Sequence, residues 1–307
     1  MEATPQPARK SDSRGFLYGI AAYGFWGVLP VYFKQLPDVP PIDVVAHRIL
    51  WSVPLLLALL AFTGSMASLR LAWGNLRLIA LLALTAVLIA VNWLLYIYAI
   101  TNGHILAGSL GYYLNPLANV LLGRFVLKER LGVLQWSAVG LAGAGIAALA
   151  VGALGQLWIS LGLCISFATY GLLRKMAPVD SPTGLTIETL LLLPFAVVWL
   201  AVGLASGQPS MGATGHDRVL LFAAGIVSTT PLLLFTAAAR KLPYSTLGML
   251  QFIAPTLQFL LAVGLYGEPF TTAHAVAFGA IWAGLLLYLA GVIRAARRQP
   301  AQQQDET

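Results

Sequence analysis

The chain has 307 residues, of which 59% are hydrophobic and only 9% are charged, and its formal net charge is +7. A soluble globular domain carries about 25% charged residues, so this chain has too few charges to cover a water-facing surface. Several uncharged stretches reach about 20 residues, the length that a helix needs to cross the hydrocarbon core of a bilayer. The composition therefore indicates an all-α polytopic membrane protein and excludes a soluble one.

Ten transmembrane helices are predicted along the chain. Turn signals separate them, among them PDVPP at 37–41, TGSMAS at 63–68 and DSPTG at 180–184. The length of the apolar runs favours helices over barrel strands, in which polar and apolar residues would alternate over about ten positions. The predicted spans are 15–34, 43–62, 77–99, 104–123, 132–151, 155–174, 184–203, 219–239, 244–266 and 273–293.

The two ends of the chain are short and polar. The first apolar run lacks a small-residue cleavage site soon after it, so we interpret it as a retained first helix and not as a signal peptide. Residues 1–14 and 294–307 are expected to be disordered tails. The single cysteine, Cys164, excludes an internal disulfide and a cysteine-based zinc site. We interpret it as a small apolar filler.

The basic residues predict the orientation, because cytoplasmic loops carry an excess of Lys and Arg. With the N-terminus in the cytoplasm, a ten-span topology places 15 of the 18 Lys and Arg on the cytoplasmic side. Lys34 and Arg218 fall outside, and Arg48 lies within a span. Both tails are therefore expected in the cytoplasm and the protein in the inner (plasma) membrane. The net charge is explained by topology, so no nucleic-acid partner is expected.

A spacing recurs in the two halves of the chain. Pro116 is followed 13 residues later by Glu129, and Pro255 is followed 13 residues later by Glu268. These two pairs are separated by 139 residues. The spacing indicates that the fourth and ninth spans correspond.

A second match supports two five-helix repeats. Arg48 and Pro54 of the second span correspond to Glu188 and Pro194 of the seventh, each at a separation of 140 residues. Five is an odd number, so the second repeat begins on the opposite side of the membrane. The sequence thus predicts inverted repeats at 15–151 and 155–293, an arrangement that places the substrate site of many transporters at the repeat interface.

Polar and aromatic side chains within the spans are candidates for a substrate cavity. Trp26, Tyr112, Asn115 and Gln251 are expected to converge on one central space. Plain packing or hydrogen bonding between helices is the alternative for each, at about 0.6 kcal/mol per bond. Asn115 could instead bond the carbonyl that Pro116 leaves unpaired. The full set of cavity candidates is Trp26, Asn92, Tyr112, Asn115, Tyr170 and Gln251, and Pro116 and Pro255 are the expected helix breaks.

Three ionisable residues are candidates for gating or ion coupling. The second span must begin near Asp43 to be long enough, which places His47 and Arg48 roughly 6–8 Å below the outer face at 1.5 Å per residue. Glu188 enters the seventh span to a similar depth from the cytoplasmic side. Arg48 and Glu188 are therefore expected at opposite gates, with snorkelling to the headgroups as the alternative. Glu188 is the first candidate for proton coupling and His47 the second.

The remaining features carry structural interpretations. Glu129 and Glu268 are expected to cap helix ends or to pair with basic residues. Gly140, Ala144 and Ala148, at four-residue spacing, are expected to form a close helix contact. The sequence contains no H-E-x-x-H, G-x-S-x-G or Walker lysine motif, so a non-enzyme without a metal or cofactor is favoured. An integral-membrane enzyme or a channel acting on a small amphipathic molecule stays open as the alternative.

The sequence also resembles a known group of proteins. The segments that carry the resemblance are AAYGFWGVLPVYFK in the first span, HRILW at 47–51, NWLLYIYA at 92–99, SLGYYLNP at 109–116, FATYGLLRK at 167–175, IET at 187–189, PLLLFTAAAR at 231–240 and STLGMLQFIAPT at 245–256. They are similar to the RarD permeases, which belong to the EamA-type drug/metabolite transporter superfamily. The resemblance covers about 15 to 293.

The resemblance implies a ten-helix inverted-repeat fold and small-molecule transport across the inner membrane by alternating access. An aromatic and amide lining suits a small polar or amphipathic metabolite or drug, because such groups stack and form hydrogen bonds without fixing a net charge. A link to chloramphenicol is implied by the resemblance only. The first-half Trp26 has Tyr170 as its counterpart, so the two halves are not equivalent at the site.

Overall fold

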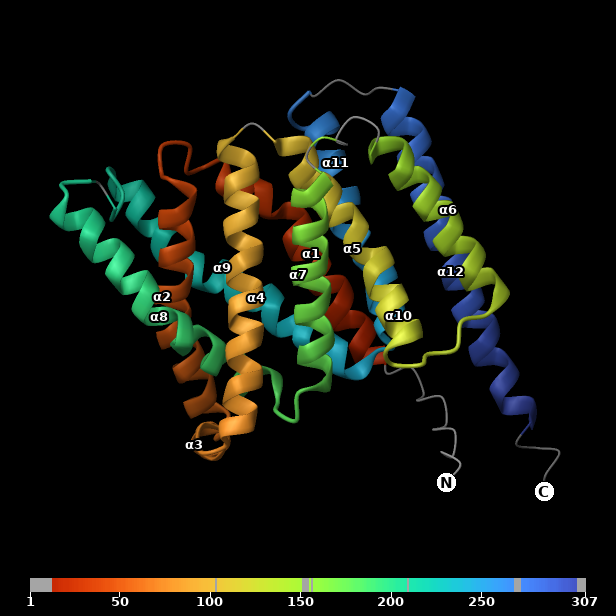
Figure 1. Ribbon diagram of the computed structural model, residues 1–307, viewed down its shortest axis with the longest axis horizontal. Coiled ribbons are helices and arrows are strands. Elements are labelled where there is room, and N and C mark those ends of the chain that lie inside the picture. The colour runs from red at the N-terminus through yellow and green to blue at the C-terminus, as the bar shows by residue number, and fades with distance from the viewer. Residues whose placement is uncertain are drawn as a thin grey trace.

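The computed structural model describes residues 13–102, 104–150, 155, 157–208, 210–267 and 272–302, and within them the regular elements are α-helices (Figure 1). Ser13 and the end of the last helix lie at the same end of the bundle, the lower end in Figure 1. The helices are α1 (Ser13–Phe33), α2 (Pro41–Phe62), α3 (Met66–Trp73), α4 (Leu76–Thr101), α5 (Ile105–Phe125), α6 (Val133–Ala150), α7 (Leu157–Met176), α8 (Ser181–Ala205), α9 (Gly215–Lys241), α10 (Tyr244–Leu250), α11 (Ile253–Gly264) and α12 (Thr272–Gln302).

Each of the ten predicted ranges overlaps a helix of the structure. Within the described residues, six helices are long and apolar enough to cross a membrane by length and composition. They are α1, α2, α7, α8, α9 and the Leu76–Ala99 part of α4. The all-helical fold and these six helices establish a multi-pass membrane protein.

One connection and the C-terminal end of the last helix differ from the prediction. Residues 63–68 carry a turn signal, but Met66 begins the short helix α3. Leu69 and Ala72 of α3 pack in one cluster with Ile187 of α8, and this contact stabilises a helix that local sequence does not predict. At the other end of the chain, α12 continues to Gln302, beyond the predicted end at 293. The alanines and arginines of this segment are strong helix formers.

The two expected helix breaks behave differently. The predicted span 244–266 is divided into α10 and α11 at Gln251 and Phe252. A proline clashes with the carbonyl four residues earlier, and for Pro255 this carbonyl belongs to Gln251. Pro116, in contrast, lies inside the continuous helix α5, so the predicted break at Pro116 is wrong. The packing of α5 against α7 and α10 holds the helix together across the proline.

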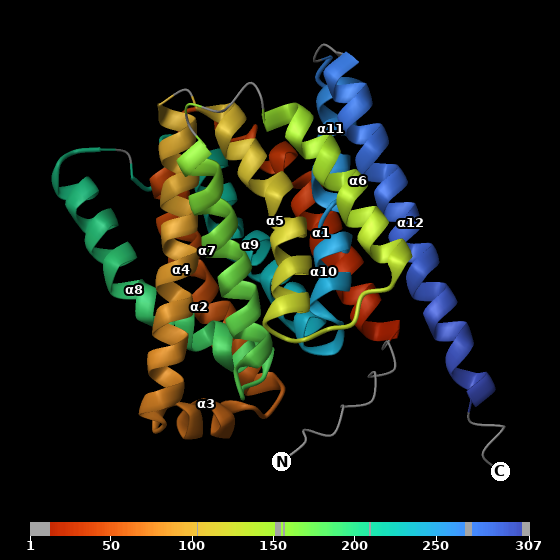
Figure 2. The same ribbon diagram turned by 45° about the vertical axis from the view of Figure 1, so that its right-hand side comes forward.

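The helices pack around a central group. α1 packs against α9 and α11, and α5 packs against α7 and α10. α2 contacts α8 and α9, and α4 contacts α7 and α8. α6 and α12 form a pair at one edge of the molecule (Figures 1 and 2). The largest buried cluster lies between α1, α7, α9 and α10 and includes Tyr23, Tyr170, Phe235 and Tyr244.

Close helix contacts occur at glycines other than the predicted one. A Cβ on Gly225 of α9 would lie 2.5 Å from the carbonyl carbon of Trp51, so α2 and α9 touch through backbone atoms. Gly140 faces open space and Ala144 is exposed, so the predicted close contact at 140 and 144 is wrong. The buried face of α6 lies two residues away, at Ala138 and Ala142.

These contacts predict the effect of adding one methyl group. Gly225→Ala forces overlap with the Trp51 backbone and should lower the free energy of unfolding by about 1–3 kcal/mol. Gly140→Ala is the matched control, because its new methyl group meets no atom within 4 Å and alanine favours a helix. Thermal unfolding of both variants in detergent measures the difference. Equal stability of the two variants would contradict the close α2–α9 contact.

Candidate functional site

A cavity of about 250 Å³ lies between the central helices. α1, α2, α4, α5, α7, α9 and the α10–α11 region all contribute to its wall. Leu29, Pro30 and Phe33 from the end of α1 line it, so the cavity extends toward the upper end of the bundle in Figure 1. The described lining residues are Tyr23, Trp26, Leu29, Pro30, Phe33, Arg48, Ile89, Asn92, Trp93, Tyr96, Tyr112, Tyr113, Phe167, Leu232, Gln251, Ala254, Pro255 and Gln258.

Aromatic rings form much of the wall. The ring centroid of Trp26 lies 5.7 Å from that of Tyr23 and 5.9 Å from that of Phe167. On the opposite side, Tyr96 and Tyr112 meet edge to face at 5.3 Å. These separations are typical of stabilising aromatic pairs. The rings support one another and leave flat apolar faces for a ligand.

The amide side chains connect the cavity wall to the surrounding helices. Asn92 of α4 donates to the Leu163 carbonyl at 2.9 Å and to Ser166 Oγ at 3.0 Å, both on α7. Gln251 Oε1 accepts from Asn119 Nδ2 at 2.8 Å, which ties the junction of α10 and α11 to α5. Asn119 was not predicted to belong to the site. Its position three residues after Pro116 and its correspondence to Gln258 in the repeat are the signals that could have found it.

The six cavity candidates are not all in one place. Trp26, Asn92, Tyr112 and Gln251 line the central cavity. Asn115 is fully buried and is not among the described lining residues, and both of its amide atoms lack a hydrogen-bond partner. The expected bond from Asn115 to a freed carbonyl is therefore not formed. Tyr170 lines a second, smaller cavity instead.

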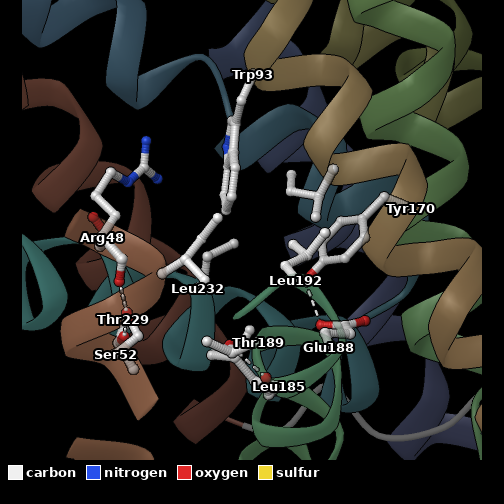
Figure 3. Close-up of a pocket in the computed structure, with 13 residues that line it drawn as sticks. Arg48, Ser52, Trp93, Tyr170, Leu185, Glu188, Thr189, Leu192, Thr229 and Leu232 are labelled. Carbon is white, nitrogen blue, oxygen red and sulfur yellow. Dashed lines mark hydrogen bonds between the residues drawn. The ribbon is translucent and has the colours of Figure 1, made fainter. Parts of the chain in front are cut away.

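The second cavity holds about 20 Å³ and adjoins the first (Figure 3). A cavity of this size has room for about one water molecule. Four residues line both cavities, namely Arg48, Ile89, Trp93 and Leu232. These shared residues form the boundary between the two spaces, and the aromatic ring of Trp93 is the largest part of it.

Glu188 lies on the wall of the small cavity within a polar network. Its Oε1 accepts from Thr85 Oγ1 at 2.5 Å and lies 3.4 Å from Arg174 Nε. Its Oε2 accepts from the Tyr170 hydroxyl at 3.4 Å (Figure 3). Arg174 and Glu188 are only 1% and 2% exposed, so this ion pair is withdrawn from solvent. The short α7–α8 connection places both residues at the same depth, a signal that could have identified Arg174 in advance.

Arg48 has a different environment from Glu188. Its Cζ lies 4.5 Å from the centroid of the Trp93 ring, a cation–π distance. Arg48 and Glu188 do not form an ion pair, and Figure 3 shows them on opposite sides of the small cavity. They nevertheless line the same small cavity. His47 is buried away from both cavities, where its Nε2 lies 2.8 Å from the Ser210 carbonyl oxygen.

The end of the bundle that lies lower in Figure 1 is held closed by polar contacts. Glu129 accepts hydrogen bonds from the backbone N–H of Tyr244 at 2.5 Å and of Ser245 at 3.0 Å, so it caps the N-terminus of α10. Lys175 donates to the carbonyls of Ala239 and Leu242, and Arg240 donates to those of Ala177 and Val179. These bonds join the α7–α8 connection to the end of α9. Glu268 lies outside the described residues.

The part of the chain that the structure describes contains no group of three or more His, Cys, Asp or Glu that could hold a metal ion. Cys164 is buried. The polar and charged groups that line the two cavities include hydroxyls, amides, the Arg48 guanidinium group and the Glu188 carboxylate.

Comparisons with known proteins place the chain among transporters. The EamA-like transporter family model matches residues 13–151. An uncharacterized transporter of Pseudomonas aeruginosa is 45% identical over 290 residues, covering 94% of this chain and 97% of that protein. Protein RarD of Escherichia coli (strain K12) is 43% identical over 297 residues, covering 94% and 98%. A solved crystal structure aligns with a TM-score of 0.70 at 19% identity, covering 90% and 97%, and shows the same fold.

The buried ion pair predicts a non-additive effect on stability. Arg174→Gln or Glu188→Gln leaves one buried charge without its partner, which typically costs about 3–5 kcal/mol of unfolding free energy. The double variant leaves neither charge, so it should be more stable than either single variant. Thermal unfolding of the three proteins measures the coupling, with Arg70→Gln as an exposed control. Additive losses in the double variant would show that the two charges do not stabilise each other.

Proposed function

Because the chain belongs to the RarD-type permeases of the EamA-like transporter family, we propose that it is a secondary transporter that moves a small polar or amphipathic metabolite or drug by alternating access. Family membership makes it a membrane transporter of the drug/metabolite superfamily with a small-molecule substrate. The observation that carries the mechanism is the aromatic cavity of about 250 Å³ between the central helices. Its lining candidates are Trp26, Asn92, Tyr112 and Gln251.

The proposed architecture is ten spans in two inverted repeats, 15–151 and 155–293. The helix contacts support it. When each helix is replaced by its counterpart in the other repeat, a pair of helices that pack together becomes another pair that packs together. The pair α5 and α7 becomes α10–α11 and α1, and the pair α1 and α9 becomes α7 and α4. The pair α2 and α9 becomes α8 and α4, and all of these pairs are in contact. Such exchange symmetry is the property that an inverted repeat requires.

The two halves differ at one contact, and this difference supports alternating access. α7 packs against α9, whereas their counterparts α1 and α4 make no comparable contact within the described residues. In the second repeat these two helices are therefore packed together, whereas the corresponding two helices of the first repeat are apart. We propose that the reverse arrangement, with α1 on α4 and α7 apart from α9, is the other transport state. Alternating access in inverted-repeat transporters is largely a rocking of one repeat or bundle against the other around a fixed site.

The proposed orientation makes the described state outward-facing. The count of basic residues supports an inner-membrane protein with both tails on the cytoplasmic side. The cavity then extends toward the outer face, and the bonds of Lys175, Arg240 and Glu129 close the cytoplasmic end. Arg48 is proposed to act on the outer side of Glu188, with both charges facing the small cavity between the two gates.

Transport itself is tested with purified protein in liposomes. Chloramphenicol is the first probe, because it is the compound that the RarD resemblance implies. We expect saturable flux of intact chloramphenicol that falls at least about tenfold in Tyr112→Ala, since this change removes a ring of the cavity wall. Val219→Ala, an exposed residue on α9, is the control. Product formation without flux would favour an enzyme, and non-saturable flux would favour a channel.

Proton coupling at Glu188 is tested by the pH profile of the same flux. The Arg174→Gln/Glu188→Gln double variant is used, because neither buried charge is then left unpaired. If Glu188 carries the coupled proton, flux in the double variant should no longer respond to an imposed pH gradient. A response equal to that of the wild-type protein would exclude Glu188, and His47→Gln would then be examined in the same assay.

A further inference from the structure

One charged residue faces the central cavity in the described part of the chain, and it is Arg48. The other described lining residues are aromatic or aliphatic, apart from the amides Asn92, Gln251 and Gln258. All three amides are already engaged in the wall. Asn92 donates to α7, Gln258 donates to the Trp26 carbonyl at 3.0 Å, and Gln251 accepts from Asn119. The guanidinium group is therefore the dominant electrostatic feature that a ligand would meet.

Arg48 has no oppositely charged partner among the described residues, whereas its counterpart Glu188 has one. Glu188, at the corresponding position of the second repeat, is matched by Arg174. No described carboxylate forms an ion pair with Arg48, and its Nε has no hydrogen-bond partner. The ring of Trp93 offsets part of the charge, but a cation–π contact contributes only about 0.5–2 kcal/mol. A charge inside a protein without a partner is costly, so the cavity is electrostatically complementary to an anion.

The chemistry of arginine narrows the choice of anion. A guanidinium group is planar and always charged, and it binds carboxylates through two parallel hydrogen bonds. The rest of the wall supplies aromatic faces at Trp26, Tyr112 and Phe167. The cavity volume of about 250 Å³ is slightly below the range of about 300–1,000 Å³ that is typical of sites for drug-sized ligands. The site is thus sized for one ring with a short acidic side chain.

We propose that the substrate class is small aromatic carboxylates, bound with the carboxylate on Arg48 and the ring between the aromatic side chains of the central cavity. This assignment rests on the proposed transport function, whose cavity it uses. It makes Arg48 the residue that selects for charge. The ring of Trp93 then holds the guanidinium group at the cavity wall.

Binding of three matched probes tests the charge preference. The probes are 3-phenylpropionate, 3-phenylpropionamide and 3-phenylpropylamine, which share one ring and chain and differ in charge. Isothermal titration of each into the purified full-length protein gives the dissociation constants. The carboxylate is expected to bind at least about tenfold more tightly than the amide, the effect of one charge-assisted hydrogen-bonded pair, and the amine more weakly still. Equal affinities, or no binding of the carboxylate, would overturn the proposal.

Substitutions at Arg48 assign the preference to its source. Arg48→Gln should bring the affinity for the carboxylate down to that for the amide and leave amide binding unchanged, a pattern that a loss of folding would not produce. Arg48→Lys keeps the charge without the planar fork and should restore part of the preference. Arg218→Gln, an exposed residue at the start of α9, removes the same charge elsewhere and should change nothing. A carboxylate preference that survives in Arg48→Gln would contradict the assignment.

The outcome separates this proposal from the proposed function. Chloramphenicol is uncharged, so its flux in liposomes does not depend on the carboxylate preference. Flux of chloramphenicol together with equal binding of the three probes would retain a transporter and reject Arg48 as the charge-selecting residue. Carboxylate binding that depends on Arg48, without flux of chloramphenicol or of 3-phenylpropionate, would retain the binding site and reject transport.

Discussion

A bilayer offers no water to a buried polar group, so each such group has to find its partner within the protein. Most of the buried polar side chains described here meet this requirement across helix boundaries. Asn92 joins α4 to α7, Glu188 joins α8 to α4 and α7, and Glu129 joins the end of α5 to the start of α10. Because these partners come from different helices, satisfying the polar groups also fixes how the helices sit around the cavity.

Ten buried polar side-chain atoms in the described residues lack a hydrogen-bond partner, and Asn115 is the residue with no amide atom paired. Asn115 is fully buried and neither amide atom has a partner in the described residues. It lies next to Pro116, where α5 packs closely on Gly248 of α10. Two unpaired groups beside a proline and a glycine contact are easier to rearrange than a satisfied network. In the proposed transport cycle, this is the part of α5 where we expect contacts with α10 to change.

The sequence predicts the helices well and the site only in part, for a physical reason. Ten long apolar runs are a strong local signal, and each overlaps a helix. Tertiary contacts determine the features that the local sequence does not predict. Packing of Leu69 stabilises the helix α3 where the sequence predicts a turn, and packing keeps α5 continuous through Pro116. Among the candidates, Trp26 and Tyr112 reach the cavity because of their helix faces, and periodicity could not separate them from Asn115. The count of basic residues treats Arg174, the partner of Glu188, as a topological charge because it lies near the end of a helix, and only its depth relative to Glu188 across the short α7–α8 connection could have identified it.

In the proposed inverted repeat, Arg48 and Glu188 are opposite charges at equivalent positions, and their environments differ. Glu188 is enclosed with Arg174 and Thr85, whereas Arg48 faces a ligand-sized space across from aromatic rings. A closed, charge-neutral network resists opening because separating its members exposes two ions at once. An unmatched cation lowers its energy when an anion enters. In the proposed mechanism, ligand therefore acts first on the half that contains Arg48.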